Sequence, residues 1–247
     1  GSTLAMPNFA LDGFRARRKE SGRGPVAEFA NQIEGRTHRG DATLGKEITI
    51  ALPAELDPEK REALARQYAG HLAHEYKTAV LLHFHEPDPQ ADQRNYHCHI
   101  EIAPMQLGED GQLTDTKTDL QLSNKQAKER GVAPQNKLIQ AEREIWAGMV
   151  NEALAEAEVD EQVDHRSLDE QGIDRAPQVH MGPTVVAMER KGKRTQKGDE
   201  NRRREQENRE ASERLAAIKA EQDEIQQGRG NGMTEYTPEE ERQAEEA

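Results

Sequence analysis

Two short runs of alternating residues, at 79–85 and 94–102, constrain the fold of this chain more than any other feature. Each run alternates as a β-strand does, and each carries a His-x-His pair. Successive side chains of a strand point to opposite faces, so the two histidines of a pair share a face. Two such strands side by side would bring three or four imidazoles into one patch. The pattern therefore predicts a metal site on a β-sheet, because imidazole is the commonest metal ligand in proteins.

The two pairs are His83 with His85, and His97 with His99. For a single pair, the more common explanation is a set of part-exposed histidines that bind nothing. The second pair makes a metal role the better hypothesis. Cys98, which is the only cysteine, points to the opposite, apolar face, and we interpret it as a small core residue.

The neighbouring segments predict one more strand and several helices. Residues 46–53 alternate like a strand, whereas residues 25–33 and 139–157 favour helices. Asp57 followed by Pro58 is typical of a helix start, because Asp accepts a hydrogen bond at the N-cap and Pro fits the first turn. This order of elements predicts an α+β fold, in which a central antiparallel sheet carries the His-x-His motif, helices flank it, and a polar helical extension follows.

Only 33% of the chain is hydrophobic and another 33% is charged, so one core cannot fill its whole length. We expect four parts: an N-terminal segment at 1–26, a sheet domain at 27–183, a charged helical extension at 184–227 and an acidic disordered tail at 228–247. Residues 1–24 predict a loop or a short helix. The helical extension should be interrupted near Gly192 and Gly198.

The formal net charge of −13 argues at first sight against a nucleic-acid partner. Acidic residues are concentrated at 205–247, however, whereas 190–204 is rich in arginine and lysine. Local patches govern phosphate binding, so the acidic total does not exclude DNA. The basic run could follow phosphates, although the acidic residues within it favour a solvated helix face.

The cysteine count and the hydropathy pattern indicate the compartment. One cysteine excludes a disulfide framework and suits a reducing environment. No apolar stretch approaches the roughly 20 residues that cross a bilayer, and no signal-peptide pattern opens the chain. We therefore expect a soluble, cytoplasmic protein without a membrane segment.

Three blocks of the sequence, in this order, resemble relaxases of the MobA/MobL type, which are HUH endonucleases. They are the strand at 47–56, the segment from His85 to His99, and residues 164–183. The resemblance covers about residues 27–200. It implies a protein of plasmid conjugative transfer that binds single-stranded DNA at the transfer origin, together with accessory relaxosome proteins. Such proteins nick one strand by attack of a tyrosine on the scissile phosphate.

The resemblance also implies a ligand set, in which His85, His97 and His99 hold a divalent cation. Mn²⁺ or Mg²⁺ is the expected ion, with Zn²⁺ as an alternative. His83 shares the face of the three ligands and is expected to be a supporting group or a spare ligand. Glu47 is expected to orient a histidine through its carboxylate.

Three more residues are expected to support the ligands or to contact DNA. Glu101 continues the histidine face of its strand. His165 and Arg166 lie in the third block of the resemblance. Asp164 and His165 could equally form a local cap.

The nucleophile is where the chain departs from the pattern. The tyrosine of such relaxases precedes the first strand of the resemblance, and this chain has no tyrosine there. Phe14, followed by Arg15, is the nearest match, and a phenyl ring cannot attack phosphorus. Tyr96 lies beside the histidines, but a tyrosine there is more typical of packing than of attack.

Three hypotheses therefore remain open. The chain is a metal-dependent relaxase whose nucleophile is not evident, or a catalytically reduced, relaxase-like DNA-binding or regulatory protein. The third is an unrelated scaffold whose histidines merely line a sheet.

Overall fold

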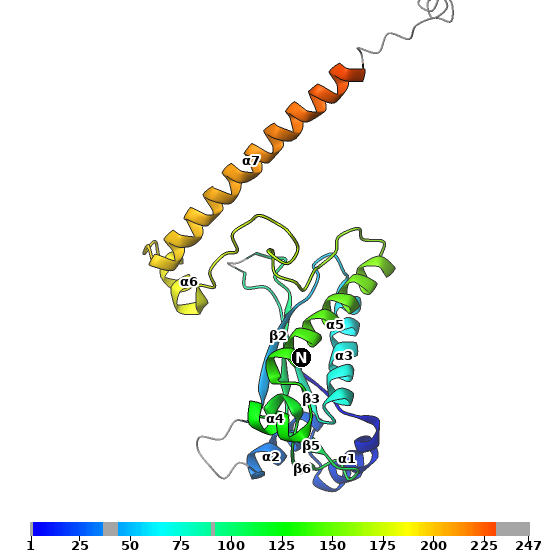
Figure 1. Ribbon diagram of the computed structural model, residues 1–247. Coiled ribbons are helices and arrows are strands. Elements are labelled where there is room, and N and C mark those ends of the chain that lie inside the picture. The colour runs from blue at the N-terminus through cyan, green and yellow to red at the C-terminus, as the bar shows by residue number, and fades with distance from the viewer. Residues whose placement is uncertain (1, 37–43, 90–91, 231–247) are drawn as a thin grey trace, which may run out of the picture. The chain divides into compact units, whose positions relative to one another are not determined.

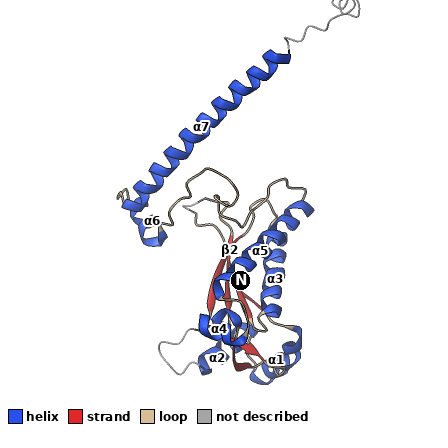
Figure 2. Cartoon of the chain, in the orientation of Figure 1, coloured by secondary structure: helices blue, strands red, loops and turns tan. Residues whose placement is uncertain are grey.

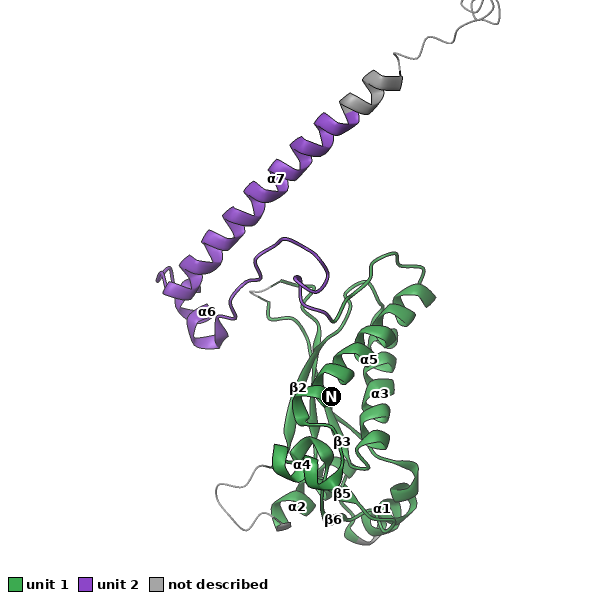
Figure 3. Cartoon of the chain, viewed as in Figure 1, with its two compact units in different colours: residues 1–165 green, residues 166–247 purple. Residues whose placement is uncertain are grey.

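The structure is a computed structural model, and the described part of the chain forms two units (Figures 1 and 3). The described residues are 2–36, 44–89 and 92–230. The first unit runs through residue 165 and the second starts at residue 166. The expected acidic tail lies almost wholly outside the described residues, and the domain limits expected near residues 27 and 183 remain predictions. Within the described ranges, no helix combines the length and the apolar character needed to cross a membrane.

The first unit is α+β, as predicted, and its main sheet is antiparallel (Figure 2). The sheet has the strand order β1-β3-β4-β2, with β1 at Ser2–Ala5, β3 at Val80–His85, β4 at His97–Ile102 and β2 at Lys46–Ala51. The register pairs His83 with His99, and His85 with His97. The two His-x-His strands are therefore neighbours.

Helices and a small hairpin complete the first unit. The helices are α1 (Asn8–Ser21), α2 (Pro25–Arg36), α3 (Pro58–Glu75), α4 (Asn124–Arg130) and α5 (Gln135–Glu156), with a 3-10 turn at Asp119–Gln121. The hairpin joins β5 (Met105–Leu107) to β6 (Leu113–Lys117). The prediction of a loop or short helix for residues 1–24 misses β1. Four residues are too few to show an alternating pattern, so pairing with β3 defines this strand rather than local sequence.

Helix α3 begins as the sequence predicts. The side chain of Asp57 accepts a hydrogen bond of 2.7 Å from the backbone N–H of Lys60, and Pro58 occupies the first helical position. The carboxylate thereby satisfies one of the N–H groups that have no partner within the helix. The cap sets the point at which α3 starts to cover the sheet.

Helices α3 and α5 lie along one face of the main sheet (Figure 1). Tyr68 and Leu72 of α3 pack there against Leu82 and Ile100 of the central strands. Cys98 is fully buried in the same cluster, which confirms that it is a small core residue. The apolar face of the two histidine strands thus forms one side of the hydrophobic core.

Helices α1 and α2 pack on the opposite face of the sheet, over only part of it. Phe14 and Phe29 bury themselves there against Leu81 and Ala103, at the end where β3 begins and β4 ends. His85, at the other end of β3, is exposed. The histidine end of this face therefore stays accessible.

A buried carboxylate ties α3 to α5. Glu142 of α5 is 5% exposed and accepts hydrogen bonds from the hydroxyls of Tyr68, at 3.3 Å, and Tyr76, at 2.7 Å. His71 Nε2 lies 3.1 Å from the same carboxylate. Burial, together with the Glu142 carboxylate, raises the pKa of both tyrosines above the ordinary value, so both hydroxyls stay protonated and donate.

The second unit contains α6 (Gly182–Arg190) and α7 (Gln196–Gly230). The expected helix break occurs at Gly192, whereas the break expected at Gly198 is wrong, because α7 passes through it. The backbone of Gly198 packs against the carboxylate of Glu189, where a Cβ would collide. Gly198 therefore permits a close approach between the two helices instead of ending one.

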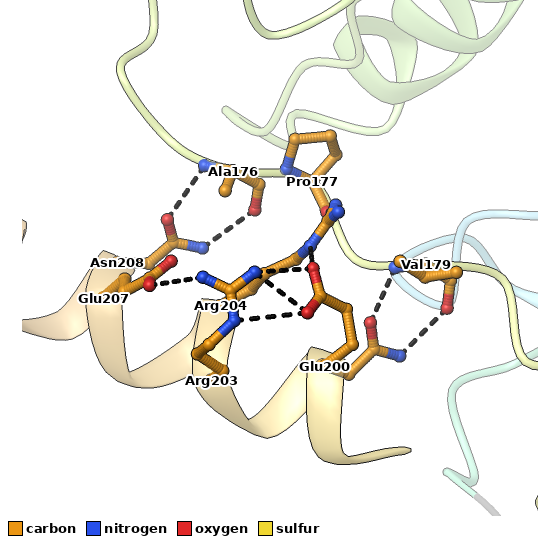
Figure 4. A network of polar contacts seen from close by, with 9 residues as sticks. Ala176, Pro177, Val179, Glu200, Arg203, Arg204, Glu207 and Asn208 are labelled. Atoms are coloured by element: carbon orange, nitrogen blue, oxygen red, sulfur yellow. Dashed lines mark hydrogen bonds and ion pairs between the residues drawn. The ribbon is translucent and has the colours of Figure 1, made fainter. Parts of the chain in front are cut away.

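Side chains of helix α7 form hydrogen bonds with the backbone of the irregular segment at residues 176–179 (Figure 4). Asn208 exchanges two hydrogen bonds with the backbone of Ala176, both at 2.9 Å. Asn201 does the same with Val179, at 2.6 and 2.9 Å. Between these pairs, Arg204 donates to the carbonyl of residue 177. The three side chains share one helix face, so the irregular segment that the sequence predicts before residue 183 is held without any strand partner.

We predict that Glu142→Ala lowers the free energy of unfolding by about 2 kcal/mol or more, because it leaves two buried tyrosine hydroxyls without an acceptor. Urea denaturation followed by circular dichroism measures the change. Glu144→Ala, on the same helix but at an exposed position, is the matched control. Equal denaturation midpoints for the two variants would show that the carboxylate does not hold α3 to α5.

Candidate metal centre

Cross-strand pairing arranges the side chains of one sheet face in three rows. The rows are Leu4, Leu81, Glu101 and Glu47; then Ser2, His83, His99 and Thr49; then His85, His97 and Ala51. Directly opposed residues on one face lie close enough to interact. The register therefore collects all four histidines of the two motifs, as the sequence predicted.

Three of the four imidazoles are mutual neighbours. The ring centres of His85 and His99 are 4.7 Å apart, those of His85 and His97 5.2 Å, and those of His97 and His99 5.4 Å. A cation bound by three imidazole nitrogens at about 2.1 Å would place the ring centres roughly 5 Å apart. Among the described side chains, no three are already arranged around one coordinating point. Binding would therefore require the rings to turn about χ2, which is a soft torsion in histidine.

Hydrogen bonds determine which ring nitrogens are available. His99 Nδ1 lies 2.9 Å from the Glu47 carboxylate, and His97 Nδ1 lies 3.1 Å from the backbone carbonyl of Asn95. Both partners can only accept, so each Nδ1 carries the proton and donates it. The lone pair of each histidine is then on Nε2, which is the form that ligates a metal. Glu47 thus lies where the sequence predicted a carboxylate that orients a histidine.

His83 is engaged differently from the other three histidines. Its Nδ1 lies 2.9 Å from the hydroxyl of Ser2, and its Nε2 is buried 3.6 Å from the carboxylate of Glu101. Both nitrogens of His83 thus face protein groups, although Nε2 has no hydrogen-bond partner, and its role as a supporting group or a spare ligand stays a prediction. Glu47 and Glu101 are opposed across the sheet, and each carboxylate faces a histidine, His99 and His83 respectively.

The charge state of His85 also suits a ligand. Partial desolvation, and then the neighbouring imidazoles of His99, His97 and His83, lower its pKa below the ordinary value. A lower pKa favours the neutral ring, which is the form with a free lone pair.

The tyrosines of the described residues do not face the histidines. Tyr68 and Tyr76 are buried against α5 and have raised pKa values. Tyr96 packs on the apolar side of the sheet, and the guanidinium carbon of Arg61 lies 3.6 Å from its ring centre. These contacts of Tyr96 are those of a packing residue. Tyr236 lies outside the described residues.

Phe14 is likewise remote from the histidines. It is 4% exposed and packs in the cluster that contains Leu81, near the start of β3. His85 follows Leu81 by four residues, which is about 13 Å along a strand. The backbone of Gly111 contacts Phe14 so closely that a Cβ would not fit there. The nearest sequence match to a nucleophile is therefore a core residue in this structure.

The last two predicted contact residues lie outside the cluster. His165 lines a pocket beside α5, and Arg166 opens the second unit. In the basic run, Arg202 pairs with Glu189 and Asp199, at 2.8 and 2.6 Å. The hydrogen bond from Arg202 is the main reason why the pKa of Glu189 falls to about 2.

Three more arginines of this run, Arg194, Arg203 and Arg204, also pair with acidic side chains. Their charge is offset within α7 and its neighbours, which favours the solvated helix face over a surface that follows phosphates.

Comparison with known proteins identifies relatives. The MobA/MobL family model matches residues 8–191. Mobilization protein MobL of Acidithiobacillus ferridurans is 36% identical over 215 residues, which are 78% of this chain and 54% of that protein. Mobilization protein A of Escherichia coli is 35% identical over 65% of this chain and 23% of that protein. Conjugal transfer protein TraA of Rhizobium radiobacter is 30% identical over 68% of this chain and 16% of that protein. The chain thus spans about half the length of the first relative and less than a quarter of the other two.

We predict that Phe14→Tyr destabilises the protein by about 1–3 kcal/mol, because the new hydroxyl would be buried without a partner. Thermal and urea denaturation of the variant and the wild type measure this change. Phe9→Tyr on the same helix is the control, since Phe9 is 45% exposed. A Phe14→Tyr variant as stable as the wild type would show that position 14 is open to solvent.

Proposed function

The chain belongs to the MobA/MobL family, and on this premise we propose that it binds single-stranded DNA of a plasmid transfer origin on the histidine face of its sheet, with a divalent cation on His85, His97 and His99. The observation that carries the proposal is the hydrogen bonding of the rings. The Nδ1 atoms of His97 and His99 donate to protein acceptors, which leaves both Nε2 lone pairs available.

The donor set favours some cations over others. Three neutral imidazoles suit Mn²⁺ and other first-row ions, and Zn²⁺ is an alternative, whereas Mg²⁺ prefers oxygen ligands. When bound, the cation would neutralise charge on phosphate oxygens and align the phosphate for in-line attack.

Other residues of the chain would orient the ligand histidines. Glu47 and the carbonyl of Asn95 fix the orientation of two ligand rings. Ser2 and Glu101 hold His83 behind the ligands.

Strand-specific nicking by a tyrosine is the activity expected of a relaxase, and no tyrosine of the described residues faces the histidines. Tyr68, Tyr76 and Tyr96 are committed to packing. That observation favours the second candidate, in which this chain binds and positions DNA as a catalytically reduced member of its family. We propose that it acts in the cytoplasm with accessory relaxosome proteins.

We predict that the wild type binds Mn²⁺ more tightly than Mg²⁺ in isothermal titration calorimetry, and that His97→Ala abolishes the binding of Mn²⁺. Glu47→Gln should weaken Mn²⁺ binding by about 10–100-fold, because the partner that orients a ligand histidine is weakened. His74→Ala removes an exposed histidine of α3 and should change nothing. Equal Mn²⁺ affinity in the wild type and His97→Ala would exclude this site.

We also predict that the chain binds a single-stranded transfer-origin oligonucleotide without forming a covalent link to it. Fluorescence anisotropy should show affinity that falls steeply with salt, because phosphate contacts release counterions. A denaturing gel after incubation with Mn²⁺ should show no DNA-linked protein. A linked band, mapped to one tyrosine by mass spectrometry, would refute the reduced form and identify the nucleophile.

A further inference from the structure

A pocket of 380 Å³ opens beside the candidate metal centre, at the end of the edge strand β2. Trp146 and Arg143 of α5 form one side of it, and Val163 and His165 form another. The third side begins at Ala51, the last residue of β2. All of these residues belong to the first unit.

The pocket adjoins the row of side chains that contains two of the ligand histidines. Ala51 is the cross-strand partner of His97. The next pocket residue, Leu52, donates a backbone hydrogen bond of 2.9 Å to the carbonyl of Tyr96, which directly precedes His97. Neighbouring strands lie about 4.8 Å apart, so the pocket begins one strand away from the metal centre. The α5 wall of the pocket lies on the apolar side of the sheet and the histidines lie on the other side, so a DNA strand with a phosphate at the histidines would pass the edge strand β2 for its neighbouring nucleotide to enter the pocket.

The pocket wall suits a planar, mostly apolar group. Trp146, the only tryptophan of the chain, is half-buried and packs against Tyr68 at 5.0 Å between ring centres. The remaining surface of its ring contributes to a lining that also includes Val150 and Leu154. Aromatic side chains of this kind bind the bases of single-stranded DNA, because every base has a π-face.

The charged groups of the pocket suit the rest of a nucleotide. Arg143 is exposed and, among the described residues, has no ion-pair partner, so its guanidinium is available for a phosphate. Three carboxylates, those of Glu55, Glu161 and Asp164, also line the pocket. Carboxylates accept hydrogen bonds from the amino group of a base such as cytosine, and thymine has no such group.

One side chain fixes the wall opposite α5. The amide of Asn151 donates to the carbonyl of Val163, at 2.9 Å, and accepts from its N–H, at 2.8 Å. Val163 is 43% exposed, so apolar burial alone does not hold it. Asn151 is therefore a positioning residue that keeps the segment of residues 161–165 at the pocket.

We infer that this pocket is a subsite for one base with an exocyclic amino group, next to the phosphate bound at the histidines. The inference rests on the proposed function, since it takes the ligand to be single-stranded DNA. It assigns binding roles to Trp146 and Arg143, and a positioning role to Asn151.

The single tryptophan provides a direct readout, because all tryptophan fluorescence of the chain comes from the pocket. We would titrate the full chain with Mn²⁺ and an oligothymidine that contains one cytosine, and follow tryptophan fluorescence and the anisotropy of a DNA label together. Moving the cytosine along the oligonucleotide should give one position at which the fluorescence is quenched. At that position, replacing cytosine by an abasic site should weaken binding by about fivefold or more and remove the quenching.

Variants separate the subsite from the metal centre. Arg143→Gln and Asn151→Ala should weaken DNA binding and reduce the preference for cytosine, while Mn²⁺ affinity stays unchanged. Arg66→Gln, at an exposed position on α3, is the matched control and should change neither. Anisotropy that reports binding without any change in fluorescence, at every cytosine position, would overturn the subsite and leave the proposed function standing. Absence of DNA binding in the anisotropy would overturn the proposed function as well.

Discussion

The antiparallel register of β3 on β4 is the constraint on which the rest of this structure depends. It pairs His85 with His97 and His83 with His99. Side chains alternate with a period of two, so a slip of one residue would turn the histidines of one strand into the core. Burial of Leu82 against α3 on the other face opposes that slip, because an imidazole at this position would have no partner there.

The core and the candidate site therefore lie on opposite faces of one pair of strands, β3 and β4. Helices α3 and α5, joined by the buried Glu142, pack on the apolar face and leave the histidine end of the other face accessible. The edge strand β2 then adds Glu47 to the histidines and leads directly into the pocket beside Trp146. Acidic and basic side chains of α7 pair with one another, so that helix contributes little free positive charge. We therefore assign the proposed binding of DNA to the sheet.

Much of this arrangement follows from local patterns in the sequence. Alternation predicts β2, β3 and β4, and Asp57 with Pro58 predicts the start of α3. Other features depend on contacts between distant residues and leave no local signal. Strand β1 is defined by its pairing with β3. In the sequence, Glu142 looks like a solvated helix residue, because the tyrosines that bury it, Tyr68 and Tyr76, are more than 60 positions away.

In the candidate site, too, some features follow from local sequence patterns and others depend on contacts between distant residues. The His-x-His spacing predicts which rings share a face, whereas the roles of Ser2 and Asn95 depend on the fold. The pocket could have been suspected from the single tryptophan in α5, but its distance from the histidines could not. Phe14 shows the limit of a motif match, because its alignment with a nucleophile says nothing about its burial against Leu81.

We propose that His85, His97 and His99 form one metal centre, in which His97 and His99 bind through Nε2. Crystals of the protein grown with Mn²⁺, with anomalous diffraction recorded at the manganese edge, test it most directly. We expect one strong anomalous peak in contact with the three imidazoles, at the Nε2 atoms of His97 and His99, while His99 Nδ1 keeps its hydrogen bond to Glu47. A structure without a peak at these rings, or with the ion on His83 and Glu101 instead, would contradict it.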